Sequence, residues 1–237
     1  MINIIGIRRS GLHIVSDYIT EISKLQFNNN INHNLYLQKE LKVGQIYLFE
    51  DADLIEFNKM TPQIDIAQVK NVIVIRDPLN MCASRIKHYS LMSSEGLYIN
   101  PSALHQWKLY FDCYTHKKKL TGIETIYVNY NKFITSAPYR SEITNQLNGV
   151  KDHKESKSEA RILDSINING GGSSFDGMHA KVMDNKYIER YKYYRELSVF
   201  QNLFTKDELK IIEDNFDIHY DFNDVQPLIV EDTIKEL

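Results

Sequence analysis

VIVIRDPLNMCASRIKH, residues 72–88, is the stretch of sequence that decides the fold. Its first half is a continuous run of β-branched residues, and it predicts a buried strand over residues 71–76. Pro78 suits the first position of a helix, because the N–H that proline lacks has no partner inside a helix start. Arg76 therefore stands where a strand ends, and Ser84 lies about two turns into the following helix.

Arg76 and Ser84 can converge on an anion such as phosphate at the carboxyl end of this strand. Ligands of open α/β sheets bind at that edge. Guanidinium and hydroxyl groups both donate hydrogen bonds to phosphate oxygens, and Arg85 adds positive charge nearby. The alternative is that Arg76 pairs with Asp77 or another carboxylate, and that Ser84 only tolerates a helix.

A second strand–turn–helix pattern lies at the N-terminus, in INIIGIRRSGLHI, residues 2–14. Residues 2–7 predict a strand and residues 12–25 predict a helix. The backbone N–H groups of such a turn point toward one place, which suits a phosphate. The turn does not match G-x-x-x-x-G-K-[ST], so it lacks the lysine and the Ser/Thr of an ATP- or GTP-hydrolysing site.

The side chains of this turn also suit an anion. Arg8 and Arg9 carry planar guanidinium groups that match phosphate or sulfate oxygens. Ser10 adds a hydroxyl group, and Gly11 lets the backbone approach a ligand closely. The alternative is an ordinary turn with two solvent-exposed arginines.

Strands and helices alternate along the rest of the chain. This alternation predicts an α/β fold in which three αβα layers surround a central, mostly parallel sheet, within a single domain over residues 1–237. The other expected elements are strands at 45–49 and 124–130, helices at 102–120, 138–148, 180–201 and 206–215, and loops at 26–42, 150–160 and 169–177.

The composition excludes several classes of protein. The formal net charge of the 237 residues is −3, so there is no general field for nucleic acid or an acidic membrane surface. The two cysteines, Cys82 and Cys113, make neither a disulfide framework nor a zinc site. The sequence shows no apolar run of membrane-spanning length and no signal-peptide pattern. We therefore expect a cytoplasmic protein with no metal, no nucleic-acid partner and no membrane span.

Three segments together resemble the sulfotransferase superfamily that uses 3'-phosphoadenosine 5'-phosphosulfate (PAPS). Residues 9–11 (RSG) match the core of the family's 5'-phosphosulfate loop, K/R-[ST]-G-T-T, and the form RRSG-x-H is closest to bacterial proteins with R-R-S-G-N-H. Residues 76–78 (RDP) with Ser84 match the 3'-phosphate motif R-[DN]-P-x-x-x-x-x-S. Residues 170–177 (GGGSSFDG) resemble the family's glycine-rich loop, and residues 190–192 (RYK) match the R-[WY]-K element that follows it.

The resemblance implies a P-loop NTPase-like sulfotransferase fold and a role for each matched residue. Arg76 and Ser84 would hold the 3'-phosphate, which would select this nucleotide over ATP. Arg9 would stabilise the charge on the leaving 5'-phosphate. The other implied nucleotide-binding residues are Arg8, the backbone of Ser10, Gly11 and Leu12, His13, and Ser173, Ser174, Phe175, Gly177 and Arg190.

One departure concerns the two threonines of the family loop, whose places are taken by Leu12 and His13. We expect His13 to replace the missing hydroxyl donor, as in the R-R-S-G-N-H proteins, and it joins Arg9 as a catalytic candidate. If His13 does not replace it, the chain binds the nucleotide without transferring sulfate.

The resemblance also implies a general base just after the second strand. In QIYLFEDADL, residues 45–54, Glu50 takes that place, with Asp51 and His13 as alternatives. A further alternative is that the two acids cap the next helix. The expected reaction moves a sulfuryl group from PAPS to a hydroxyl or amine of a glycan or small metabolite and releases PAP. A small-molecule kinase and a non-catalytic nucleotide-binding protein are the competing functions.

Overall fold

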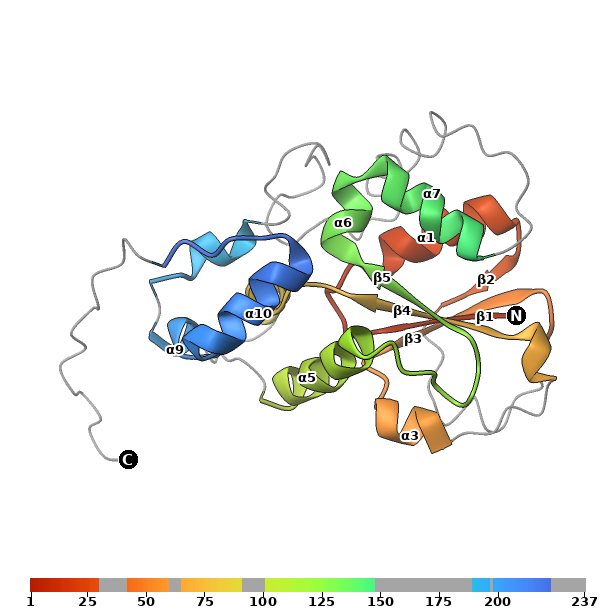
Figure 1. Ribbon diagram of the computed structural model, residues 1–237, viewed down its shortest axis with the longest axis horizontal. Coiled ribbons are helices and arrows are strands. Elements are labelled where there is room, and N and C mark those ends of the chain that lie inside the picture. Colours follow the sequence, from red (N-terminus) through yellow and green to blue (C-terminus); the bar gives the residue numbers. More distant parts are fainter. Residues whose placement is uncertain (30–41, 60–64, 91–100, 148–188, 197, 223–237) are drawn as a thin grey trace.

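A five-stranded, all-parallel sheet forms the centre of the protein (Figure 1). The computed structural model describes residues 1–29, 42–59, 65–90, 101–147, 189–196 and 198–222. The strands lie in the order β2-β3-β1-β4-β5, so β1 is central and pairs with both β3 and β4. Their bounds are β1 Ile2–Gly6, β2 Gln26–Asn28, β3 Gln45–Glu50, β4 Lys70–Ile75 and β5 Thr125–Asn129.

Both faces of the sheet are covered, which explains why its strands are apolar at almost every position. Successive side chains of a strand point to opposite faces. In β4, Val72 and Val74 therefore lie in one core cluster, while Ile73 and Ile75 lie in the other. Ile4 and Ile5 of β1 divide in the same way, and these side chains are at most 1% exposed. The predicted three-layer αβα architecture with a parallel central sheet is confirmed.

The helices follow the same division (Figure 1). One core cluster is completed by α1, α6 and α7, and the other by α3, α4, α5, α9 and α10. Their bounds are α1 Leu12–Ser23, α3 Leu54–Lys59, α4 Pro78–Ser90, α5 Pro101–Thr115, α6 Tyr130–Thr135, α7 Ala137–Gln146, α9 Ser198–Gln201 and α10 Lys206–Phe216, with 3-10 turns η1 Ile66–Gln68 and η4 Arg190–Tyr193.

The C-terminal elements pack near the carboxyl end of β4 around a buried tryptophan (Figure 1). The Trp107 ring stacks on Phe111 at 4.8 Å between centroids and meets Phe204 edge-on at 5.7 Å. Its indole Nε1 donates a hydrogen bond of 2.8 Å to the carbonyl oxygen of Arg76. The aromatic core therefore fixes the backbone at the point where the predicted anion site begins.

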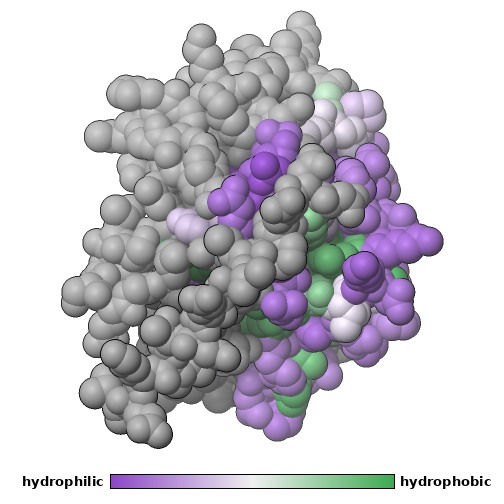
Figure 2. All heavy atoms as spheres, turned by 90° about the vertical axis from the view of Figure 1, so that its left-hand side faces the viewer, coloured by the Kyte–Doolittle hydropathy of each residue, from purple (hydrophilic) through white to green (hydrophobic). Residues whose placement is uncertain are grey.

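The surface carries few large apolar side chains among the described residues. Val43, Ile55 and Ile211 are the large hydrophobics more than half exposed, and they belong to different segments. On the side of α9 and α10, Figure 2 shows hydrophilic residues around a smaller group of apolar ones. Scattered apolar residues of this kind are normal for a protein surface.

Some expected elements differ from the structure. The loop predicted over 26–42 begins with β2, which pairs parallel to β3. The predicted helix over 180–201 is wrong for its described part, which consists of η4, a turn and the short α9. There the backbone N–H of Tyr191 donates to Asn80 Oδ1 at 3.0 Å, so a tertiary contact replaces a helical hydrogen bond. The glycine-rich segment 169–177 lies outside the described residues.

Candidate functional site

The loop between β1 and α1 has the backbone geometry of an anion site. Arg9 and Gly11 are in the left-handed region, with φ of 73° and 89°. Ser10 is buried, and its backbone N–H and its hydroxyl both donate to the Ile7 carbonyl oxygen, at 3.1 and 2.6 Å. These bonds close the loop tightly. Gly11 caps α1 without a side-chain hydrogen bond, and the first turn of α1 has no acidic residue, so this helix start suits an anion.

Two arginines donate to one buried hydroxyl group beside this loop, and a third arginine holds the loop backbone. Ser84 Oγ accepts hydrogen bonds from Arg9 Nε at 3.2 Å and from Arg190 Nη1 at 3.3 Å. Arg76 Nη1 donates to the carbonyl oxygen of Arg9 at 3.2 Å. Arg76, Ser84 and Arg190 are at most 5% exposed. Residues from the loop, β4, α4 and η4 thus gather at the carboxyl end of the sheet, where open α/β sheets bind ligands.

The electrostatics of this cluster favour a negative partner. Burial lowers the pKa of Arg9, and the nearby charge of Arg76 lowers it further, whereas Glu50 acts in the opposite direction. The Arg76 guanidinium also lies 5.1 Å from the centre of the Tyr130 ring, close enough for a cation–π contact. Buried like charges oppose one another, and a bound anion would relieve this repulsion.

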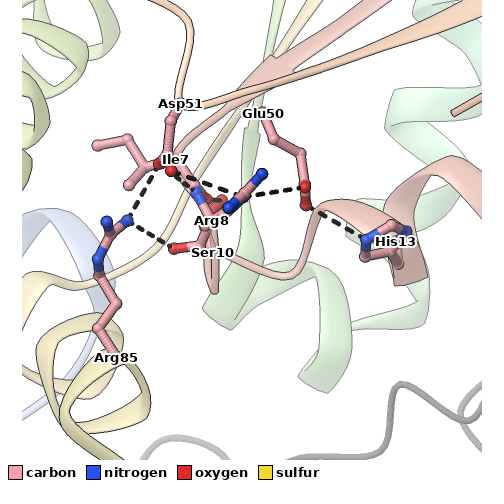
Figure 3. Close-up of polar contacts among 7 residues, drawn as sticks. All are labelled: Ile7, Arg8, Ser10, His13, Glu50, Asp51 and Arg85. Carbon is pink, nitrogen blue, oxygen red and sulfur yellow. Dashed lines mark hydrogen bonds and ion pairs between the residues drawn. The ribbon is translucent and has the colours of Figure 1, made fainter. Parts of the chain in front are cut away.

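A second group of charges lies on the β3 side of the loop (Figure 3). Glu50 Oε1 is 3.2 Å from His13 Nε2, and Glu50 Oε2 accepts from Arg8 Nε at 3.2 Å. Asp51 Oδ1 accepts from the backbone N–H of Arg8 at 2.9 Å and from Arg85 Nη1 at 3.0 Å. Glu50 ends β3 and Asp51 follows it, and the two acids therefore tie the loop to α1 on one side and to α4 on the other.

The His13–Glu50 contact changes the pKa of both groups. The hydrogen bond to Glu50 raises the pKa of His13, although burial opposes this shift. Burial alone would raise the pKa of Glu50, but His13 and Arg8 outweigh it, and the pKa is lowered. Helix α3 is capped by Asp53, which accepts from the N–H groups of Ile55 and Glu56. Asp53, rather than Glu50 or Asp51, therefore caps this helix.

Asp77, which follows Arg76, is held by neutral donors. Its carboxylate is 0% exposed and accepts from the Asn80 backbone N–H at 2.9 Å, from Asn131 Nδ2 at 3.0 Å and from the Tyr220 hydroxyl at 2.8 Å. These bonds fix the start of α4 and attach the segment after α10 to it. Asp77 therefore orients the helix that carries Ser84.

The structure brings most of the predicted site residues together and leaves some apart. Leu12 is 2% exposed and its side chain packs in a core cluster, so only its backbone faces the loop. Tyr130 was not predicted as a site residue, although it is the last residue of the predicted strand over 124–130. The residues brought together are Arg8, Arg9, Ser10, Gly11, His13, Glu50, Arg76, Ser84 and Arg190. Ser173, Ser174, Phe175 and Gly177 lie outside the described residues.

This arrangement defines a parallel α/β protein with a candidate anion site at the carboxyl ends of β1 and β4. The structure is similar to a mouse sulfotransferase, SULT7A1, complexed with PAP, with a TM-score of 0.52 and 14% identity over 90% of this chain and 88% of that one. It also matches retinol dehydratase in complex with androsterone and the inactive cofactor PAP, with a TM-score of 0.48 and 12% identity over 93% and 82% of the two chains.

The similarity to SULT7A1 confirms the predicted sulfotransferase-like fold. No protein-family model and no curated protein sequence matches the chain. The similarity to the R-R-S-G-N-H subgroup and the cytoplasmic location stay predictions. Among the described residues, no helix combines the length and the apolar character needed to cross a membrane.

Proposed function

We propose that this protein binds PAPS and transfers its sulfuryl group to a hydroxyl or amine of a small acceptor, releasing PAP. The observation that carries the proposal is the buried Ser84 hydroxyl group, which accepts hydrogen bonds from both Arg9 and Arg190. Arg76 lies next to it and donates to the Arg9 carbonyl oxygen. This cluster supplies the charge and the directed donors that a phosphate monoester requires. The fold shared with SULT7A1, a sulfotransferase complexed with PAP, supports the same assignment.

The two ends of the nucleotide would bind on either side of the loop. Arg76, Ser84 and Arg190 would hold the 3'-phosphate, and Arg9 would join them because its Nε donates to Ser84. The 5'-phosphosulfate would lie at the start of α1, near the backbone of Gly11 and Leu12. We also propose that the loop residues Ser173, Ser174, Phe175 and Gly177 close over the nucleotide.

In sulfuryl transfer, the S–O bond to the 5'-phosphate breaks while a bond from sulfur to the acceptor oxygen or nitrogen forms. The leaving phosphate gains negative charge, so cations and N–H donors at the loop would stabilise the transition state. Arg8, Arg9 and His13 are the charged side chains of that loop and of the first turn of α1. The acceptor must also lose a proton. Glu50 stays the predicted base, with Asp51 and His13 as alternatives.

Calorimetric titration tests the nucleotide. We expect PAP to bind without Mg²⁺, and to bind more tightly than ATP or ADP. Arg76→Ala and Ser84→Ala should each weaken PAP binding roughly 10- to 100-fold, the range for losing hydrogen bonds to a charged group. Arg195→Ala is the control, because its partly exposed side chain forms a long ion pair of 3.9 Å with Asp221. Magnesium-dependent ATP binding with no PAP binding would refute the proposal and favour a kinase.

Turnover tests transfer separately from binding. Radiolabelled PAPS would be incubated with a panel of phenols, alcohols, amines and sugars, and PAP release and labelled products would be measured. A buried Leu12 in place of a threonine hydroxyl favours a second candidate, a nucleotide-binding protein without transferase activity. Tight PAP binding without labelled product from any acceptor would support this second candidate.

A further inference from the structure

The charges around the loop divide into two groups, and Arg9 belongs to the group at Ser84. Its Nε donates to Ser84 Oγ, so the side chain that the sequence assigns to the leaving phosphate is turned toward the 3'-phosphate site. On the other side of the loop, both oxygens of Glu50 are engaged by His13 and Arg8 (Figure 3). Within the described loop and the first turn of α1, His13 and Arg8 are therefore the cations on the side of the loop away from Ser84.

His13 has a suitable position for this role. It is the second residue of α1, two residues after the cap residue Gly11, so it lies in the helix turn whose first N–H groups suit an anion. Its side chain is 51% exposed, whereas the side chain of Glu50 is 11% exposed. A ligand can thus reach the imidazole, while the carboxylate behind it is largely enclosed.

We propose that Glu50 is a positioning residue that holds His13 as a charged imidazolium at the start of α1, where it donates to the 5'-phosphosulfate of the bound nucleotide. Arg8 holds the second carboxylate oxygen and so fixes the orientation of Glu50. The inference rests on the proposed function. It gives Glu50 a role different from that of general base, because both of its oxygens already accept from cations.

The charged groups around His13 give the expected dependence on pH. The hydrogen bond to Glu50 raises the pKa of His13 and the charge of Asp17 adds to this, while burial and the charge of Arg9 oppose it. Arg8 pairs with Glu50, at 3.2 Å between Arg8 Nε and Glu50 Oε2. A raised pKa keeps the imidazolium present to a higher pH than in an ordinary histidine. The contribution of His13 to anion binding should therefore be full below its pKa and lost as the pH rises through it.

Comparison of two ligands isolates the 5' end. PAPS and 3'-AMP share the 3'-phosphate, but only PAPS carries the phosphosulfate, which does not titrate near neutral pH. Calorimetry from pH 6 to 9 should show that the affinity advantage of PAPS over 3'-AMP falls about 3- to 10-fold as pH rises, the effect of losing one half-exposed charge. Glu50→Gln should move this transition to lower pH, and His13→Arg should abolish it while keeping the advantage at every pH.

Two control variants make similar chemical changes, loss of a carboxylate and loss of a histidine, away from the loop between β1 and α1. Glu56→Gln removes a carboxylate from an exposed ion pair with Lys59, and His116→Gln removes an exposed histidine paired with Asp112. Neither should change the transition.

Two results would overturn the inference while leaving the proposed function intact, and a third would overturn both. If the pH transition in the PAPS advantage is unchanged in Glu50→Gln, Glu50 does not position His13. If that variant also loses turnover at every pH, Glu50 behaves as a general base. A pH-independent advantage in the unmodified protein would remove the role of His13. If neither PAPS nor 3'-AMP binds at all, the proposed function itself fails, and the inference fails with it.

Discussion

Gly11→Ala should destabilise the protein more than a glycine substitution with a similar backbone conformation elsewhere. Gly11 has a φ of 89°, where an L residue costs about 1–2 kcal/mol. A Cβ there would lie 2.0 Å from a ring carbon of Tyr130, so the ring must retreat until it reaches an ordinary contact beyond 3.4 Å. Overpacking of this kind costs about 1–3 kcal/mol. The sum predicts a loss of roughly 2–5 kcal/mol in the free energy of unfolding.

Gly44→Ala is the matched control. Gly44 has a φ of 83°, and no atom of the described residues lies within 4 Å of a Cβ built on it, so only the backbone penalty of about 1–2 kcal/mol applies. Urea unfolding followed by circular dichroism would compare the two variants with the unmodified protein. Because the Tyr130 ring lies against the Arg76 guanidinium, Gly11→Ala should also weaken PAP binding, whereas Gly44→Ala should not.

Equal destabilisation by the two substitutions would refute the steric argument, because the backbone penalty alone would then explain both. Loss of stability in Gly11→Ala with unchanged PAP affinity would refute the link from Tyr130 to Arg76. A smaller side chain at position 130 gives a further check. In a Tyr130→Leu background, Gly11→Ala should reduce the free energy of unfolding by less than it does alone, and a double-mutant cycle measures this difference.

Three other predictions concern stability. Tyr220→Phe should cost about 1–3 kcal/mol in urea unfolding, because it removes a 2.8 Å hydrogen bond to the buried Asp77 carboxylate; unchanged stability would contradict this bond. Thr205→Ala should cost about 0.5–2 kcal/mol in thermal unfolding, because Thr205 forms a capping box at the start of α10, and Thr205→Asp, which keeps an acceptor, should cost less. The His13–Glu50 pair should contribute most to the free energy of unfolding between pH 4.5 and 6.5, the ordinary pKa values of the two groups. The contribution of Glu50 is lost as the pH falls through its lowered pKa, and that of His13 is lost as the pH rises through its raised pKa. The stability difference between the unmodified protein and Glu50→Gln should therefore shrink on both sides of this window; a difference independent of pH would contradict the pairing.

The sheet could be predicted because its signals are local. The β-branched run of β4 and the proline that follows it define a strand and a helix start from neighbouring residues alone. The observed strand, Lys70–Ile75, agrees with the predicted strand over 71–76 within one residue at each end, and α4 begins at Pro78 as predicted. The position of Arg76 and Ser84 on one side of the junction follows from the same local pattern, and the structure places both beside Arg9.

The partners of individual side chains could not be predicted, because they depend on contacts between distant segments. Arg9 follows β1, yet its Nε donates to a hydroxyl on α4. Glu50 is the last residue of β3, and its carboxylate meets His13 only because β1 and β3 are adjacent in the sheet. Residues 190–193 form a 3-10 turn rather than part of a helix for the same reason, since Asn80 accepts the Tyr191 N–H.

The two predicted phosphate sites share one network of hydrogen bonds. Arg76 donates to the carbonyl oxygen of Arg9, and the side chain of Arg9 donates to Ser84. Asp51 joins the same loop to α4 through Arg8 and Arg85. A ligand phosphate that draws Arg9 away from Ser84 must therefore change the loop at the start of α1 as well. Binding of the 3'-phosphate at Ser84 and binding of the 5'-phosphosulfate at the start of α1 should therefore be energetically coupled. Substitutions at Ser84 and His13 should then have non-additive effects on PAPS affinity.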